Sequence, residues 1–328
     1  MREPGGNRRP FTVLSIDGGG VRGIFAAATL AHLEADHGIR IAERFDLIVG
    51  TSTGGVLALG VGAGMSPQEI VELYVREKDT IFPGSRRRAL RRPVALFRSK
   101  YRPDGLETTL RSAFGHKLLC DSIVPLVVTS YDIGQRAPHL FKTPHHDRLV
   151  RDWRVPMWQV AMATTAAPTF FPGYVLPDEY VRLVDGGVWA NNPSMVGIAE
   201  AVSLFGQPLG NIRLLSLGTT SSTAVRERQL DRGGLIQWVR SPNVVEVLMS
   251  GQSAGAFNQA LHMIGSNHAW RLDPPAPSKL ARLDDADARD LISAAAHHSR
   301  HFGPTFAAHF AAHQPQPYAP LRPRKDVA

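Results

Sequence analysis

The sequence contains very little cysteine and no long hydrophobic run. Cys120 is the single cysteine among 328 residues, which excludes an internal disulfide framework and indicates a reducing compartment. No stretch approaches the ~20 consecutive apolar residues that a membrane-spanning helix needs. Residues 1–10 are polar and carry three arginines without a following apolar segment, which is not the pattern of a signal peptide. We therefore expect a soluble, cytoplasmic protein.

Several motifs of common protein classes are also missing. The sequence has no zinc-ligand spacing, no aromatic RNA-binding motif and no heptad repeat, so neither a metal site nor a nucleic-acid duplex partner is predicted. The chain has fewer acidic than basic residues: it contains 29 Asp and Glu and 37 Lys and Arg, which gives a net charge of +8 and a pI of about 10.0. This excess favours anionic partners, namely phospholipid headgroups, nucleotides or nucleic acid, without choosing between them.

Apolar segments typical of strands alternate with helical patterns along the first two thirds of the chain. The expected strands cover residues 11–16, 45–49, 124–129, 181–184 and 212–217. Helical patterns follow the first two strands and also occupy 156–163 and 194–204. A further helix is expected to begin at Pro67, because Ser66 and Glu69 form a capping box around it. This alternation predicts a three-layer α/β/α fold with a mostly parallel central sheet.

The chain is expected to form one domain. Hydrophobic residues make up 43% of it, which is enough for a single large core. The core with the sheet is predicted over residues 11–219. The strand signal then fades and 235–264 is mainly helical, so 220–313 is predicted to be a helical extension of a domain that covers 1–313. Residues 314–328 are rich in proline and charge and are predicted to be a disordered tail.

A serine nucleophile is suggested by the segment Gly50-Thr51-Ser52-Thr53-Gly54, which matches the G-x-S-x-G nucleophile elbow. A serine between a strand and a helix must sit on a sharp turn, and the residues two before and two after it lie too close for side chains. Gly50 and Gly54 meet that requirement, and the motif follows an expected strand and precedes a helical pattern. The alternative is a turn of small residues that only lets the helix pack on the strand.

A glycine-rich loop, residues 17–23, also joins a strand to a helix. The backbone N–H groups of Gly18, Gly19 and Gly20 could form an oxyanion hole, with Arg22 anchoring the loop or attracting an anionic headgroup. The same glycines fit a dinucleotide-binding pattern, but the next strand ends in Gly50 and not in the acidic residue that holds a ribose. If the loop has no functional role, it is simply a flexible tight turn. The elbow on the following strand favours the oxyanion hole.

The serine needs a base, and Asp185 follows an expected strand at the end where α/β sites assemble. An ordinary α/β-hydrolase would add a histidine after this aspartate. Several histidines follow Asp185, but none lies in a loop that visibly follows a sheet strand. A Ser52–Asp185 dyad is therefore favoured over a triad, although order along the chain does not exclude one. The histidines after Asp185 are His262, His268, His297, His298, His301, His309 and His313.

Several segments together, in this order, resemble the patatin-like phospholipase family. The segments that match the family's oxyanion motif, elbow and dyad aspartate are 17–23, 50–54 and 185–187. Residues 163–172 and 215–219 are also similar to family segments, so the resemblance runs from about residue 11 to 219. It implies a patatin-like fold and a Ser52–Asp185 dyad that hydrolyses lipid acyl esters without a histidine, a metal or another cofactor.

The region after the core looks like that of stand-alone bacterial members of this family. The similarity lies in 234–238 and in Gln252, Asn258 and Gln259. Some of these relatives are effectors of CBASS anti-phage systems, which a cyclic oligonucleotide activates to degrade the cell's own membrane. The resemblance therefore implies a cyclic oligonucleotide activator, although no motif assigns a site for it.

A basic segment interrupted by apolar residues lies between residues 86 and 102. Its positive residues are Arg86, Arg87, Arg88, Arg91, Arg92, Arg98, Lys100 and Arg102. Such a segment could dock on an anionic bilayer, hold a phosphorylated activator or be a solvated loop. Phe170 and Phe171, between two prolines, are candidates for the lining of an acyl channel or for ordinary core.

The sequence thus predicts an acyl hydrolase of membrane phospholipids that works at the inner face of the cell membrane. The oligomeric state is left undetermined, with a homo-oligomer among the alternatives. Two rival hypotheses remain at this point. One is a Ser-His-Asp esterase that acts on small soluble esters. The other is a nucleotide sensor without hydrolase activity, in which the glycine-rich loop cradles phosphate.

Overall fold

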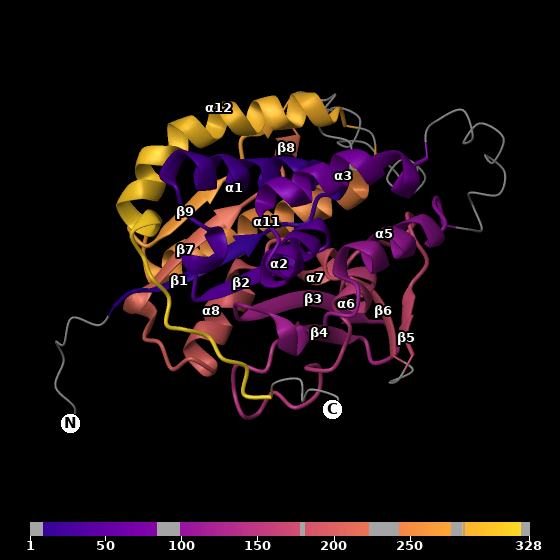
Figure 1. The fold of residues 1–328 in the computed structure, drawn as a ribbon, viewed down its shortest axis with the longest axis horizontal. Helices are drawn as coiled ribbons and strands as arrows, with labels where there is room; N and C mark the ends of the chain where they lie inside the picture. The colour runs from indigo at the N-terminus through magenta and orange to yellow at the C-terminus, as the bar shows by residue number, and fades with distance from the viewer. Residues whose placement is uncertain are drawn as a thin grey trace, which may run out of the picture.

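The computed structural model describes residues 9–83, 99–177, 181–222, 243–276, 284 and 286–322. A central sheet lies between helices on both of its faces (Figure 1), so the predicted three-layer α/β/α fold is confirmed. The strands are β1 (Phe11–Ile16), β2 (Leu47–Thr51), β3 (Leu126–Asp132), β4 (Ala137–Lys142), β5 (Tyr174–Leu176), β6 (Val181–Asp185), β7 (Ile212–Leu217), β8 (Ser221–Ser222), β9 (Ala269–Leu272) and β10 (Pro275–Ala276). The helices are α1 (Gly23–His37), α2 (Thr53–Gly62), α3 (Pro67–Ile81), α5 (Asp104–Phe114), α6 (Met157–Thr164), α7 (Gly187–Ala190), α8 (Ser194–Ser203), α11 (Asn243–Ile264) and α12 (Ala288–Phe306).

The main sheet has eight strands and is mostly parallel, as predicted. Its order is β5-β6-β3-β2-β1-β7-β9, and β4 also pairs with β3. The five strands β1, β2, β3, β7 and β9 run parallel, whereas β4 and β6 are antiparallel to β3 and β5 is antiparallel to β6. The antiparallel strands gather at one side of the sheet, and this side carries half of the candidate site.

The core is built on strands that are buried on both faces. In β1, Leu14 and Ile16 pack into the larger apolar cluster under α1 and α2, while Val13 points to the smaller cluster under α8. Such strands appear in the sequence as continuous apolar runs, because both faces are covered by helices. This is why β1 and β7 lie at their predicted positions, Phe11–Ile16 and Ile212–Leu217.

The helix start predicted at Ser66 is confirmed. The Ser66 hydroxyl accepts a hydrogen bond from the Glu69 N–H at 3.2 Å, and the Glu69 carboxylate accepts one from the Ser66 N–H at 2.7 Å. Pro67 occupies the first helical position, where its missing N–H costs nothing. The helix α3 that begins here ends at Ile81, beside the candidate site.

The sheet extends beyond the predicted core, because β9 pairs in parallel with β7 at its edge. The predicted helical extension, 220–313, therefore also contains a sheet strand that the sequence pattern did not indicate. Ala269-Trp270-Arg271-Leu272 is only four residues long and contains an arginine, so its pattern is weaker than that of a central strand. The rest of this region is helical: α11 covers one face of the sheet, and α12 packs against α1 (Figure 1).

Residues 314–322 have no regular secondary structure, but they lie against the protein. The Leu321 N–H donates a hydrogen bond of 2.9 Å to the carbonyl of Pro144, and the Tyr318 hydroxyl is buried. The rest of the predicted tail, 323–328, lies outside the described residues. No helix in the described part of the chain is both long and apolar enough to cross a membrane.

Candidate active site

Ser52 occupies the turn between β2 and α2 that the elbow motif predicts. Its backbone has φ 54° and ψ −123°, a left-handed conformation that a residue with a side chain rarely adopts. A Cβ on Gly50 would lie 2.3 Å from the carbonyl oxygen of Gly54, and one on Gly54 would lie 2.3 Å from that of Ile16. Both contacts are with backbone atoms that cannot move aside. The two glycines are therefore required by the close approach of the turn, as predicted.

Two hydroxyl groups hold this turn in place. The Ser52 N–H donates to the Thr164 hydroxyl at 2.8 Å, and that hydroxyl donates to the carbonyl of Thr129 at 2.7 Å. The Thr51 hydroxyl, in turn, donates to the carbonyl of Ala190 at 2.6 Å. These bonds connect the elbow to α6, β3 and α7. Nothing in the sequence pattern marks Thr164 for this role, because its partner is 112 residues away.

The register of β3 places Asp185 beside Ser52. One edge of β3 is paired with β4 along residues 127–132, so β2 and β6 must share the other edge. Thr51 at the end of β2 pairs with Thr129, and Asp185 at the end of β6 pairs with the next residue, Ser130. The parallel β2 and the antiparallel β6 therefore meet end to end, and their terminal side chains face each other.

Ser52 and Asp185 are in direct contact. The Ser52 Oγ donates a hydrogen bond of 2.5 Å to Oδ2 of Asp185, and both side chains are buried. The other carboxylate oxygen, Oδ1, accepts a bond of 2.7 Å from the Gly187 N–H. Burial raises the pKa of Asp185 to about 6, although the hydrogen bonds from Ser52 and Gly187 act in the opposite direction. A carboxylate with a raised pKa is a stronger base than an ordinary aspartate and is still ionised at neutral pH.

The glycine-rich loop supplies two amides to the site and not three. The Gly18 N–H donates a hydrogen bond of 3.0 Å to the carbonyl of Asn191, so it is not available as a donor, contrary to the prediction. Gly19 and Gly20 line the cavity in front of Ser52, and their N–H groups have no acceptor among the described residues. These two amides are the candidates for an oxyanion hole. Gly18 is needed for space, since a Cβ there would lie 2.6 Å from the side-chain oxygen of Asn191.

Arg22 anchors the loop. Its guanidinium is buried, and it donates to the carbonyls of Thr220 at 2.9 Å and Gly19 at 3.3 Å. Of its two predicted roles, the structure supports the anchor, because a buried guanidinium cannot meet an anionic headgroup at the surface.

A buried ionic network, which the sequence did not reveal, supports the loop from behind. Asp17, directly before the three glycines, accepts a hydrogen bond of 2.7 Å from Arg271 on β9. Arg271 also donates to Asp273 and to the Ser216 hydroxyl, each at 2.7 Å. Burial raises the pKa of Asp17 to about 6, while the charge of Arg271 acts against this rise. An ion pair between two residues that are 254 positions apart in the sequence thus connects β9 to the glycine-rich loop.

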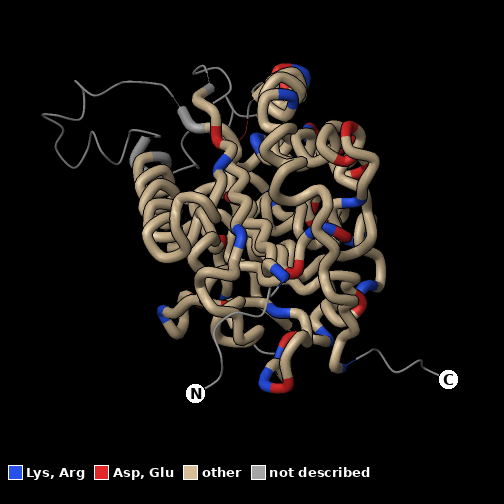
Figure 2. Tube along the Cα trace, turned by 90° about the vertical axis from the view of Figure 1, so that its left-hand side faces the viewer, with Lys and Arg blue, Asp and Glu red and all other residues tan. Residues whose placement is uncertain are grey.

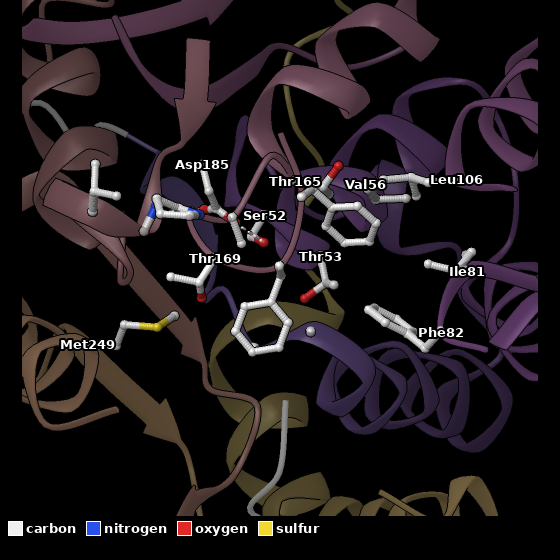
Figure 3. Close-up of a pocket in the computed structure, with 18 of the residues that line it drawn as sticks. Ser52, Thr53, Val56, Ile81, Phe82, Leu106, Thr165, Thr169, Asp185 and Met249 are labelled. Atoms are coloured by element: carbon white, nitrogen blue, oxygen red, sulfur yellow. Dashed lines mark hydrogen bonds between the residues drawn. The ribbon is translucent and has the colours of Figure 1, made fainter. Parts of the chain in front are cut away.

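Ser52 and Asp185 open into a cavity of about 340 Å³ with predominantly apolar walls. Figure 3 shows the two side chains facing each other, with Val56, Ile81, Phe82 and Leu106 to one side and Met249 to the other. The side chains of Val56, Ile81 and Leu106 are buried, so this part of the cavity is the closed end. Phe170 and Phe171 also line the cavity, and both belong to the larger apolar cluster as well, in which Phe171 is buried and Phe170 packs against it.

No histidine lines this cavity. All thirteen histidines lie within the described residues, and the seven that follow Asp185 are on α11, on α12 or in the segments next to β9 and after α12. His309 stacks on Trp270, and His313 is hydrogen-bonded to Asp46 at 2.8 Å. The structure therefore offers no third member for a triad. In the part of the chain that the structure describes, no group of His, Cys, Asp or Glu is placed to hold a metal ion.

The basic segment lies almost entirely outside the described residues. This applies to Arg86, Arg87, Arg88, Arg91, Arg92 and Arg98. The described end of the segment adjoins the cavity. The Lys100 N–H donates a hydrogen bond of 2.9 Å to the carbonyl of Thr169, a residue that lines the cavity. The Lys100 ammonium forms an ion pair with Asp284.

Residues 14–198 match the sequence model of the family described as patatin-like phospholipase, which is more than half of the chain. The chain belongs to the patatin-like phospholipase family. The predicted membership is confirmed, and the elbow and Asp185 both fall inside the matched residues.

Two of its relatives are bacterial proteins named cGAMP-activated phospholipase. The one from Pseudomonas aeruginosa is 32% identical over 287 residues, which cover 86% of this chain and 83% of the relative. The one from Vibrio cholerae is 33% identical over 232 residues, which cover 63% of each chain, so less than two thirds of that protein is matched. Patatin-like protein 4 of Arabidopsis thaliana is 34% identical over 57% of this chain and 51% of its own.

Proposed function

We propose that this protein is a serine acyl hydrolase that releases fatty acids from membrane phospholipids, with Ser52 as nucleophile and Asp185 as base. The observation that carries the proposal is the 2.5 Å hydrogen bond between Ser52 Oγ and Asp185 Oδ2, placed in a cavity with apolar walls. The family membership agrees with it. The apolar closed end suits an acyl chain, which gains about 0.8 kcal/mol for each methylene group that it buries.

The reaction follows from the positions of these groups. The substrate's ester carbonyl lies against the N–H groups of Gly19 and Gly20, and Asp185 takes the proton of Ser52 as its oxygen attacks the carbonyl carbon. The tetrahedral intermediate collapses, the ester C–O bond breaks, and Asp185 returns the proton to the departing alkoxide. A water molecule then attacks the acyl-enzyme, giving its proton to Asp185. Breakdown of this second intermediate returns the proton to Ser52 and releases the fatty acid.

A cyclic oligonucleotide is the proposed activator, in an anti-phage defence system. Support comes from the names of the Vibrio and Pseudomonas relatives, which are both described as activated by cGAMP. The net charge of +8 suits an anionic ligand, although no group of described residues is assigned to hold it. We propose that the active protein works in the cytoplasm, bound peripherally to the inner face of the membrane.

The test is fatty-acid release from vesicles that contain phosphatidylglycerol, with and without cGAMP. Wild type is compared with Ser52→Ala and Asp185→Asn, and with two controls, Ser203→Ala and Asp147→Asn, which change exposed residues of the same types. We expect release by wild type and by both controls, and a loss of at least about a thousandfold in Ser52→Ala and Asp185→Asn. Dependence on cGAMP would support the activator.

The same assay separates the proposal from its rivals. A wild-type protein that binds cGAMP but releases no fatty acid under any condition would contradict the hydrolase and favour a sensor. Full activity of Asp185→Asn would remove the aspartate from the mechanism. Release only from short soluble esters, and never from vesicles, would point to an esterase.

A further inference from the structure

The mouth of the Ser52 cavity lies between α7, α11 and the loop before β5. The cavity residues at this end are exposed, in contrast to the buried closed end: Val188 of α7 is 42% exposed and Leu248 of α11 is 62% exposed. Pro168 and Thr169 complete the rim and are exposed as well. A substrate that reaches Ser52 therefore passes between apolar side chains that already face solvent.

The first half of α11 extends this apolar surface away from the mouth. Val247, next to Leu248, is 44% exposed and does not line the cavity. From residue 247 to 264 the helix contains no Lys, Arg, Asp or Glu. The uncharged stretch begins directly after Glu246, and in Figure 2 this part of α11 runs at the left margin of the molecule with no Lys, Arg, Asp or Glu along it. An exposed helix of this kind is unusual on a soluble protein unless something covers it.

One exposed cation, Arg102, adjoins the same rim, whereas the charge of Lys100 is paired with Asp284. The backbone N–H groups of Lys100 and Tyr101 donate hydrogen bonds of 2.9 and 2.8 Å to the carbonyls of Thr169 and Phe170, so this segment of the chain borders the mouth. Arg102, which follows directly, is exposed. Apolar side chains that insert into a bilayer and cations that meet lipid phosphates are the two components of peripheral membrane binding.

We infer that the mouth and the first half of α11 form the surface that docks on an anionic phospholipid bilayer. This inference rests on the proposed hydrolysis of phospholipids and specifies which face meets the lipid. A bilayer is favoured over a second copy of the chain because the exposed residues Val188 and Leu248 are also walls of the cavity. An occupant that covers them must leave a route for an acyl chain to Ser52, and a bilayer supplies that chain itself.

The test compares two matched positions on α11. Val247 and Met263 are 44% and 45% exposed, and they are 16 residues, or about 24 Å, apart along the helix. Val247→Asp and Met263→Asp are each made in the Ser52→Ala protein, which cannot hydrolyse lipid. Sedimentation with vesicles of phosphatidylglycerol and phosphatidylcholine, with and without cGAMP, then measures binding without catalysis. We expect Val247→Asp to weaken vesicle binding about tenfold or more and Met263→Asp to change it less than about twofold.

A variant that binds vesicles more tightly serves as a control, because a protein that fails to fold would not gain binding. Val247→Trp should bind the same vesicles more tightly than the parent, because an indole is favoured at the membrane interface. In the background with Ser52, Val247→Asp should hydrolyse detergent-dispersed lipid within about twofold of wild type, since Val247 does not line the cavity. If Val247→Trp does not bind the vesicles more tightly, the proposed docking face is wrong even where the hydrolase proposal stands.

Other outcomes overturn the inference. Equal losses in Val247→Asp and Met263→Asp would mean that binding is not local to the mouth. Absence of vesicle binding by the Ser52→Ala parent under all conditions would exclude docking by this face. A change of molar mass in light scattering for Val247→Asp, with vesicle binding unchanged, would make the face an interface between copies of the chain.

Discussion

The buried Asp185 carboxylate is expected to lower the stability of the protein above pH 6, so Asp185→Asn should be inactive and yet more stable. An asparagine has nearly the same shape and keeps both contacts: its Oδ1 accepts from the Gly187 N–H, and its Nδ2 donates to the Ser52 oxygen in place of the hydroxyl donating to Oδ2. What the substitution removes is the ionised group, and with it the cost of holding a charge away from water.

The magnitude follows from the pKa. Burial raises the pKa of Asp185 from 3.8 to about 6, a difference of about 2 units, and each unit corresponds to 1.36 kcal/mol. Below pH 3.8 the carboxyl group is protonated in both the folded and the unfolded chain. Between pH 3.8 and 6 only the unfolded chain releases the proton, so the free energy of unfolding falls as pH rises. Above pH 6 the loss is complete, at about 3 kcal/mol.

The assay is thermal unfolding at pH 4 and at pH 8. An unfolding entropy of about 2.1 cal/mol/K per residue gives about 0.7 kcal/mol/K for 328 residues, so 3 kcal/mol corresponds to a Tm difference of roughly 4 °C. We expect Asp185→Asn to melt about 4 °C above wild type at pH 8 and within about 1 °C of it at pH 4. In wild type, kcat/KM should rise with pH through a midpoint near 6, as the base loses its proton.

The control is Asp147→Asn, which makes the same chemical change at an exposed carboxylate. An Asp185→Asn protein that melts at or below the wild-type temperature at pH 8 would refute the reasoning. It would mean that the hydrogen bonds from Ser52 and Gly187 compensate the burial of the charge completely. Retention of activity by the variant would separately contradict the proposed base.

Three further predictions concern the loop, the elbow and the absence of a histidine. Arg271→Leu leaves the Asp17 carboxylate buried without its cation, so unfolding free energy should fall by about 3–5 kcal/mol and kcat should drop, with partial recovery of kcat in Arg271→Lys. Gly54→Ala should give little soluble protein, because its Cβ would lie 2.3 Å from the Ile16 carbonyl, whereas Gly210→Ala, with nothing within 4 Å, should express normally. Replacing each of the thirteen histidines singly by asparagine should leave vesicle hydrolysis within about fivefold of wild type, and a loss beyond a hundredfold in any one of them would reinstate a triad.

The sequence predicted those parts of the fold that depend on local pattern. β1 and β7 are continuous apolar runs because both faces are covered, and they were placed at their observed bounds. The strand expected at 45–49 is observed as β2, Leu47–Thr51, two residues later, because the chain stays extended as far as the elbow. β4, β5 and β9 were not predicted. β5 and β9 have only three and four residues, and β4, although six residues long, is buried at only two of its positions, so none of them is a continuous buried apolar run.

At the site, residue types that chemistry requires were predicted, and contacts made over long distances in sequence were not. Ser52 was found from the elbow and Asp185 from its place after a strand. The sequence could not show that the Gly18 N–H is already hydrogen-bonded to the carbonyl of Asn191, 173 residues later, and is therefore not available as a donor in the cavity. Arg271 was missed for the same reason, because only the pairing of β9 with β7 brings it to Asp17.

The topology of β3 supports the proposed dyad, in which two residues do the work for which an α/β-hydrolase uses three. In a triad the carboxylate reaches the serine through an imidazole, and the two must stand apart to make room for the ring. Here Thr51 and Asp185 pair with consecutive residues of one strand edge, and consecutive residues are only about 3.3 Å apart along a strand. Ser52, directly after Thr51, therefore meets the carboxylate itself at 2.5 Å. A histidine inserted between them would have to displace β6 from β3, so the antiparallel strand that delivers Asp185 also argues against a triad.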